Sequence, residues 1–428
     1  MSLDSVRRTL SSHFHLTLTI FGVVLSLHSA LLADDNWPDY LGPNQNGHAQ
    51  ANNLPISWSE TENVTFKTEI HDRGWSSPLI WGNQIWMTTA TADGHKMYAV
   101  CVDKNTGKIL HDIHLFDVEE PQEINSVNSY ASPTVAIEAG HVYAYFGTYG
   151  IACLDTKSGK VLWQRRDLVL EHMEGPGSSP VIFEDLLIFH CDGTDVQYII
   201  ALNKKTGKTA WKNQRSFPHY EDLIPPLRKA YSTPVFAKID GNTQLISTGA
   251  QAAYGYEPQT GKELWRVDFK KAWSVGGRPT VGGGLVYLAT GYGGKSLLAI
   301  DPTGRGVITD THVKWSIDRN VPNRSTPLYH EGLIYMVSDK TFATCLDAKT
   351  GEQIWIERLG REFDASPLFA DGRIYFFDRD GETTVIEPGR KFKVLAKNQL
   401  DNGLMGSAAV SDNALFLRTE THLYRIEK

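Results

Sequence analysis

The side chains best suited to bind a ligand recur at one kind of place in this sequence, at or just before a short motif in which a small or polar residue precedes proline. They comprise four aromatic residues, two acids, two arginines and one asparagine, namely Trp75, Tyr130, Glu174, Tyr231, Trp273, Arg278, Asn323, Arg324 and Asp364. Aromatic walls with a few convergent charges suit a planar or polar small ligand. Alternatively, the opposite charges only neutralise one another around a water-filled opening.

The proline motif marks a repeating unit. It reads SSP at 76, ASP at 131, SSP at 178, STP at 232, GRP at 277, STP at 325 and ASP at 365, with GSAA at 406 as a proline-less eighth. Each unit continues with an alternating apolar run, such as GHVYAYFG at 140–147, whose period of two indicates a half-buried strand. Most then carry a phrase like CLDTKSGKVLW at 153–163.

The phrase predicts a tight turn between the third and fourth strands of each unit. Glycine there supplies a positive φ without steric cost, and Asp and Thr or Ser can bond the local backbone. Each unit therefore has four strands. The first lies at the proline, the second in the apolar run, the third ends at the Asp and the fourth follows the turn. Eight such units predict an all-β, eight-bladed β-propeller with four-stranded antiparallel blades.

Tryptophans on the fourth strands should cover the gaps between neighbouring blades; they are Trp163, Trp211, Trp265, Trp315 and Trp355. The seventh unit has none. The last unit stops after three strands, so we expect residues 62–70 to pair with it and close the ring, which removes an open sheet edge. Residues 34–61 would then form a strap outside the strands, and 62–428 a single propeller.

The Asp-x-x-Thr-Gly-Lys-x-x-Trp phrase resembles the tryptophan-docking motif of the PQQ-like (quinoprotein or BamB-like) propeller family, over essentially all of residues 37–428. The resemblance implies the eight-bladed fold. In that family's dehydrogenases, pyrroloquinoline quinone (PQQ) is polarised by a Ca²⁺ ion held by Glu, Asn and Asp, and many have an adjacent cysteine pair. This chain offers Glu174, Asn323 and Asp364 as the corresponding ligand types. It has no adjacent cysteine pair and few large insertions, and its three candidates are not aligned with the family's ligands, so we assign no catalytic residue.

The amino terminus predicts export. Arg7 and Arg8, an apolar stretch and small residues up to Ala33 are typical of a signal peptide over residues 1–33, which implies a periplasmic or secreted protein with no membrane anchor after cleavage. The four cysteines occupy separate units, so we expect buried free thiols. A formal charge of −7 without a basic block argues against a nucleic-acid partner.

Two long insertions, 116–130 and 216–231, should lie on the face opposite the turns, together with the ligand-binding candidates. Three functions remain open. The first is a non-catalytic scaffold that binds a protein or envelope component through this loop-rich face. The second is a small periplasmic PQQ-dependent alcohol or sugar dehydrogenase. The third is a propeller that binds a carbohydrate or another small molecule without chemistry.

Overall fold

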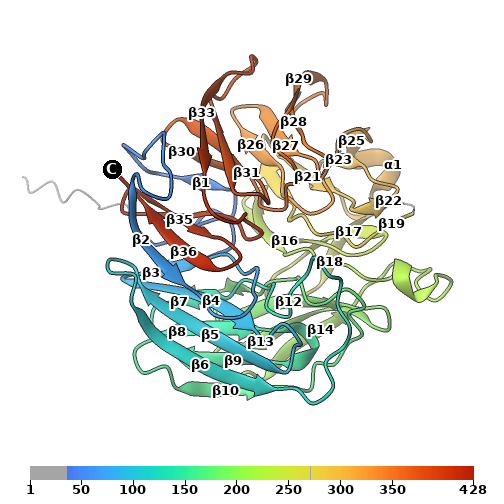
Figure 1. Ribbon diagram of the computed structural model, residues 1–428. Helices are drawn as coiled ribbons and strands as arrows, with labels where there is room; N and C mark the ends of the chain where they lie inside the picture. The colour runs from blue at the N-terminus through green and yellow to red at the C-terminus, as the bar shows by residue number, and fades with distance from the viewer. Residues whose placement is uncertain (1–35, 270) are drawn as a thin grey trace, which may run out of the picture. The chain divides into compact units, whose positions relative to one another are not determined.

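The computed structural model describes residues 36–269 and 271–428; the signal peptide expected at 1–33 lies outside them. Eight antiparallel sheets are arranged in a ring (Figure 1), which confirms the eight-bladed propeller. The described residues form one short α-helix, α1 (Thr309–His312). Two 3₁₀ turns, η1 (Gly147–Tyr149) and η2 (Pro225–Leu227), lie in loops.

In blades 1 to 7 the four blade strands follow one another in chain order from the channel outward. Blade 1 contains β3 (Leu79–Trp81), β4 (Gln84–Ala90), β5 (Lys96–Asp103) and β6 (Ile109–Asp117). Blade 2 contains β7 (Ala136–Glu138), β8 (His141–Tyr145), β9 (Ile151–Asp155) and β10 (Val161–Arg165). Blade 3 contains β11 (Val181–Phe183), β12 (Leu186–Asp192), β13 (Gln197–Asn203) and β14 (Thr209–Gln214). Blade 4 contains β15 (Val235–Ile239), β16 (Asn242–Thr248), β17 (Ala252–Tyr256) and β18 (Glu263–Asp268), with β24 (Gly306–Val307) added at its outer edge.

The second half of the ring repeats this order. Blade 5 contains β20 (Thr280–Gly282), β21 (Leu285–Ala289), β23 (Leu297–Ile300) and β25 (Val313–Ile317). Blade 6 contains β26 (Leu328–His330), β27 (Leu333–Val337), β28 (Phe342–Asp347) and β29 (Gln353–Arg358). Blade 7 contains β30 (Leu368–Ala370), β31 (Arg373–Phe377), β32 (Glu382–Ile386) and β33 (Val394–Gln399). Blade 8 contains β34 (Ala409–Ser411), β35 (Ala414–Arg418) and β36 (His422–Ile426). A separate small ribbon joins β19 (Ala272–Trp273) to β22 (Tyr292–Gly293).

The N-terminal strand β2 (Val64–Glu69) pairs antiparallel with β36 and completes blade 8, which confirms the predicted closure. On β2, Phe66 takes the place that tryptophan has in other blades. Its ring lies against Gly107 in the turn of blade 1, where an added Cβ would come within 2.7 Å of it. The ring of blades is thus closed by strand pairing and by an aromatic contact.

The repeated phrase forms the expected turn. In blade 1, Asp103 accepts hydrogen bonds at 2.8 Å from both the backbone N–H and the hydroxyl of Thr106, and Gly107 has φ +71°. A side chain on the preceding blade then docks over the glycine. Trp163 lies on Gly207 in this way, and its indole N–H donates to the Lys204 carbonyl at 2.9 Å. The phrase therefore serves the joints between blades.

Trp211, Trp315 and Trp355 donate in the same way to carbonyls of the following blade. Trp265 differs: its indole N–H donates to Gln244 of its own blade at 2.8 Å, and β24 pairs beside it. The cause is the longer segment of the fifth unit, which replaces the standard turn. In blade 7, which lacks a tryptophan, Trp58 from the strap stacks on Tyr375 at 6.3 Å between ring centroids.

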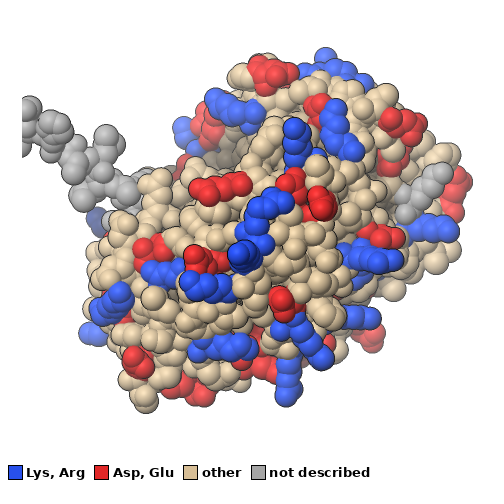
Figure 2. Space-filling model, turned by 90° about the horizontal axis from the view of Figure 1, so that it is seen from above, with Lys and Arg blue, Asp and Glu red and all other residues tan. Residues whose placement is uncertain are grey.

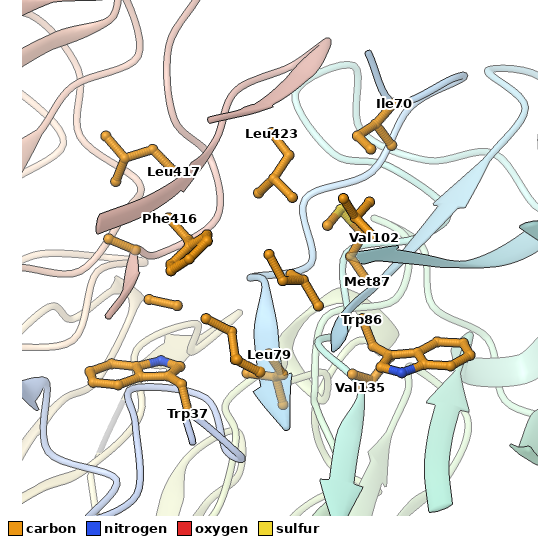
Figure 3. Packing of buried hydrophobic residues seen from close by; sticks show 14 of the residues in the cluster. Trp37, Ile70, Leu79, Trp86, Met87, Val102, Val135, Phe416, Leu417 and Leu423 are labelled. Atoms are coloured by element: carbon orange, nitrogen blue, oxygen red, sulfur yellow. The ribbon is translucent and has the colours of Figure 1, made fainter. Parts of the chain in front are cut away.

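The core consists of apolar clusters between adjacent blades. The largest joins blades 7, 8, 1 and 2 with the strap, and Figure 3 shows Trp37 beside Leu79, with Phe416 and Leu417 of blade 8 nearby. Cys101, Cys153, Cys191 and Cys345 are buried free thiols, as expected.

The strap does not stay outside the strands as predicted. Trp37 forms a backbone bridge with Ile80 of β3, and β1 (His48–Ala49) pairs in parallel with β30, so residues 37–49 bind the innermost strands. The reason is that the inner edges of these strands expose backbone groups that need partners. Only later does the strap run outward, where Leu54 N–H and Trp58 N–H donate to Asp371 and Asn398.

No helix in residues 36–269 or 271–428 is both long and apolar enough to cross a membrane. On the face seen in Figure 2, Lys and Arg are interspersed with Asp and Glu. This distribution agrees with the lack of a basic block in the sequence.

Candidate functional site

One residue at or beside each repeat's proline motif takes part in a ring of hydrogen bonds around the channel. A backbone N–H of one blade donates to a hydroxyl of the next at 2.9 to 3.1 Å, in the order Ser77 to Thr134, Thr134 to Ser179, Ser179 to Thr233, Arg278 to Thr326, Thr326 to Ser366, Ser366 to Ser407 and Ser407 to Ser77. The ring is interrupted where Arg278 replaces the hydroxyl residue. Ser and Thr hydroxyls of the proline motifs therefore join seven of the eight pairs of neighbouring blades.

In the second unit the motif is displaced by two residues. Thr134, which follows Pro133, takes the ring position that Ser77 takes before Pro78 in the first unit. Ser132 therefore corresponds to Trp75, and Tyr130 lies outside this set. The reason is that the interblade hydrogen bond, rather than the proline, determines the register.

A cavity of about 330 Å³ opens in the channel above this ring. The residues two positions before each ring residue all line it, namely Trp75, Ser132, Gly177, Tyr231, Gly276, Arg324, Asp364 and Met405. Five ring hydroxyls also line it, on Ser77, Thr134, Ser179, Thr233 and Ser407. Tyr40 of the strap also lines the cavity, and its hydroxyl hydrogen-bonds the Ser366 hydroxyl at 3.1 Å.

Six of the nine predicted ligand-binding residues line this cavity: Trp75, Glu174, Tyr231, Trp273, Arg324 and Asp364. Tyr130 does not, because it is buried and its hydroxyl donates to the Gln122 carbonyl. Asn323 is buried behind the wall, where its backbone N–H donates to Asp339 and its carbonyl accepts from Gly276.

Arg278 holds the strap instead of facing a ligand. Its side chain is 1% exposed and donates to the Pro234 carbonyl at 2.7 and 2.9 Å, to the Tyr40 carbonyl, and to the Asp39 carboxylate at 2.9 Å. A buried guanidinium needs a counter-charge, and the strap supplies it. This partner is 239 residues away in the sequence, so the local motif could not reveal it.

The charges at the cavity mouth are paired with one another. Asp364 lies 2.7 Å from the Arg324 Nε and 3.2 Å from the Arg379 Nε. Burial raises the pKa of the Asp364 carboxyl, and the two guanidiniums offset only part of this effect. Glu174 lies 3.4 Å from the buried Lys229 ammonium and accepts a hydrogen bond from the Ser274 hydroxyl. Burial also raises the pKa of Tyr231, and Glu174 adds to the shift.

These surroundings do not fit a calcium-bound quinone. A Ca²⁺ ligand must face the cation, whereas Asp364 faces two guanidiniums and Glu174 faces an ammonium. In the described part of the chain, no three His, Cys, Asp or Glu side chains meet as a metal-binding group. PQQ is a tricarboxylic acid, yet among the described residues the one basic side chain on the cavity wall, Arg324, is already paired. We therefore derive no catalytic step through this cofactor.

Three consecutive interblade loops, 118–135, 166–180 and 215–234, are bonded into one surface, here called the platform. Gln122 Nε2 donates to the Leu170 carbonyl at 3.0 Å and Asn128 Nδ2 to the Glu174 carbonyl at 2.7 Å. Tyr231 joins the third loop to the second through its hydroxyl, which donates to the His172 carbonyl at 2.7 Å. The two long insertions therefore lie together, as expected for loops of one face.

Sequence reasoning missed several residues of the cavity, among them Tyr40, Asn125, Asn128, Ser132 and Ser274. The ring hydroxyls had a visible signal, since Ser or Thr precedes proline in most units. The other residues had none, because they belong to the strap and to irregular loops.

A family model described as "Outer membrane protein assembly factor BamB" matches residues 88–240, 195–326 and 309–391. No curated protein sequence matches the chain.

Solved structures share the fold at low identity. The quinohemoprotein alcohol dehydrogenase from Comamonas testosteroni has a TM-score of 0.68 at 11% identity, over 92% of this chain and 80% of that one. BamB from Moraxella catarrhalis has a TM-score of 0.57 at 15% identity, over 85% of this chain and 99% of that one. A europium-containing methanol dehydrogenase has a TM-score of 0.54 at 12% identity, over 89% of both chains.

Proposed function

Because the chain belongs to the PQQ-like propeller family described as outer membrane protein assembly factor BamB, we propose that it is an exported, non-catalytic scaffold. It would bind a partner protein or another component of the cell envelope through the platform. The amino-terminal sequence pattern supports a periplasmic or secreted location, which would agree with this role.

The observation that carries this proposal is the apolar and acidic character of the platform. Ile224 and Val169 are 63% and 62% exposed, the highest values among the large apolar side chains of the described residues, and Met173 is 51% exposed. The same three loops also carry exposed acidic side chains, namely Glu119, Glu120, Glu123, Glu171, Glu221 and Asp222. Exposed apolar groups with a polar rim are typical of a protein-binding surface. The partner surface would be apolar with basic groups at its edge.

The dehydrogenase alternative has less support. The two dehydrogenases among the structural neighbours are 11% and 12% identical in sequence to this chain. Identity at this level indicates a shared fold and not a shared activity. In addition, the two acids that could bind a metal already form ion pairs: Asp364 with a guanidinium group and Glu174 with an ammonium group.

A photo-crosslinking residue at Ile224 tests the scaffold proposal. Ile109, which is 45% exposed at the turn end of β6 on the opposite face, is the matched control. In the native cell envelope, we expect a discrete crosslinked product from position 224 that is absent from position 109. Equal products from both positions, or none from position 224, would contradict the proposal. Quinone-dependent dye reduction by the purified protein would instead favour the dehydrogenase.

A further inference from the structure

Five hydroxyl groups on the cavity wall can still donate a hydrogen bond. The oxygens of Ser77, Thr134, Ser179, Thr233 and Ser407 each accept a backbone N–H from the neighbouring blade. No hydrogen bond within residues 36–269 and 271–428 uses the proton of any of these hydroxyls. Since all five line the same cavity, they present convergent donors to any molecule inside it.

Aromatic side chains also line the same cavity. Trp75 and Trp273 contribute to its wall, Tyr231 stands next to Thr233, and Tyr40 of the strap also contributes. Trp75 is held in place because its indole N–H donates to the Val127 carbonyl at 3.1 Å, so its ring is preorganised. A ligand that fits must therefore combine oxygen acceptors with C–H faces that can pack on aromatic rings.

The electrostatics of the cavity favour a ligand without net charge. Arg324 is compensated by Asp364, and Glu174 by Lys229. A charged ligand would lose its hydration without gaining an unpaired counter-charge. The volume of about 330 Å³ lies at the lower end of the range for small-molecule pockets and limits the ligand to one or two small rings.

We propose that the central cavity binds an uncharged carbohydrate of one or two hexose units, which the arc of ring hydroxyls and the aromatic walls would hold. This ligand site is separate from the platform contact proposed above and does not depend on it.

Isothermal titration calorimetry of the purified chain with glucose, galactose and maltose tests the inference, with glucose 6-phosphate as the charged comparison. We expect saturable binding of at least one neutral sugar with a dissociation constant no weaker than about 1 mM, and weaker binding of the phosphate. Absence of saturable binding by all three neutral sugars, or tighter binding of glucose 6-phosphate, would overturn the proposal.

Two threonines of the ring provide a matched pair of variants. Thr233 and Thr326 both accept an interblade N–H, at 3.1 and 2.9 Å, but only Thr233 lines the cavity. Thr233→Val should weaken sugar binding about two- to tenfold, as expected for one lost hydrogen bond. Thr326→Val should lower the melting temperature by about as much as Thr233→Val does, but it should leave sugar binding unchanged. Equal effects of the two variants on affinity would mean that the ring hydroxyls act only as joints.

Discussion

Replacing Arg278 by methionine should loosen the strap from the inner strands. The change removes the donors to the carbonyls of Pro234 and Tyr40 and leaves the Asp39 carboxylate without its counter-charge. Removing one partner of a buried ion pair costs about 3–5 kcal/mol. With an unfolding entropy of about 2.1 cal/mol/K per residue, the roughly 390 described residues give about 0.8 kcal/mol/K. The Tm should therefore fall by about 4–6 °C.

We also expect the stability loss of the Arg278→Met variant to depend on pH in a definite direction. Burial raises the pKa of Asp39, and Arg278 is the main group that opposes this rise. A carboxyl whose folded-state pKa is raised favours folding when it is protonated, and this contribution is lost as the pH rises through that pKa. Without Arg278 the pKa of Asp39 rises further. The stability deficit of Arg278→Met should thus be larger at neutral pH than near pH 4.

Differential scanning calorimetry at the two pH values measures both effects, and limited proteolysis reports whether residues 37–49 are released first. The control is Arg361→Met, since Arg361 is 81% exposed and pairs with Asp380 at the surface, where the cost should stay below about 1 kcal/mol. If Arg278→Met matched this control, or if its deficit grew towards acid pH, the assignment of Arg278 as the strap anchor would be refuted.

Four further predictions concern the joints between blades, two buried groups and the cofactor. Trp211→Ala should cost about 3 kcal/mol in chemical denaturation because the docking of this ring onto Gly261 is lost, and an unchanged midpoint would count against docking as a joint. Burial lowers the pKa of His172 to about 4, so the wild type should lose up to about 3 kcal/mol between pH 6.5 and pH 4, and His172→Gln should flatten this part of the stability profile. Burial raises the pKa of Cys191 to about 11, so an aromatic disulfide reagent should label this thiol only after unfolding. Saturating PQQ with Ca²⁺ should leave the Tm unchanged, whereas a calcium-dependent rise would restore the dehydrogenase hypothesis.

The number of blades, the turns and the closure of the ring could be predicted from the sequence because their determinants are local and repeated. Asp103 bonds Thr106 three residues away, and Gly107 takes its positive φ within the same turn. The same pattern recurs in most repeats, so it can be recognised even though one unit departs from it. The missing fourth strand of the last unit was visible for the same reason.

The cavity was only partly predictable. Six of its wall residues were found because they stand near a local motif, but Tyr130 was misplaced by a register shift of two that depends on a bond from Ser77 to Thr134. No feature of residues 131–134 distinguishes the two registers. The path of the strap was also wrong, since its partners are spread over blades 1 and 4 to 8.

The sequence alone therefore determined the architecture, because alternating strands and tight turns depend on neighbours within a few residues. Only the tertiary structure determined the role of each residue at or near the cavity. Arg278 binds the strap, Arg324 and Asp364 neutralise each other, and Thr233 faces the cavity while Thr326 does not. These roles depend on charges and hydrogen-bonding groups that only the closed ring brings together from distant parts of the chain.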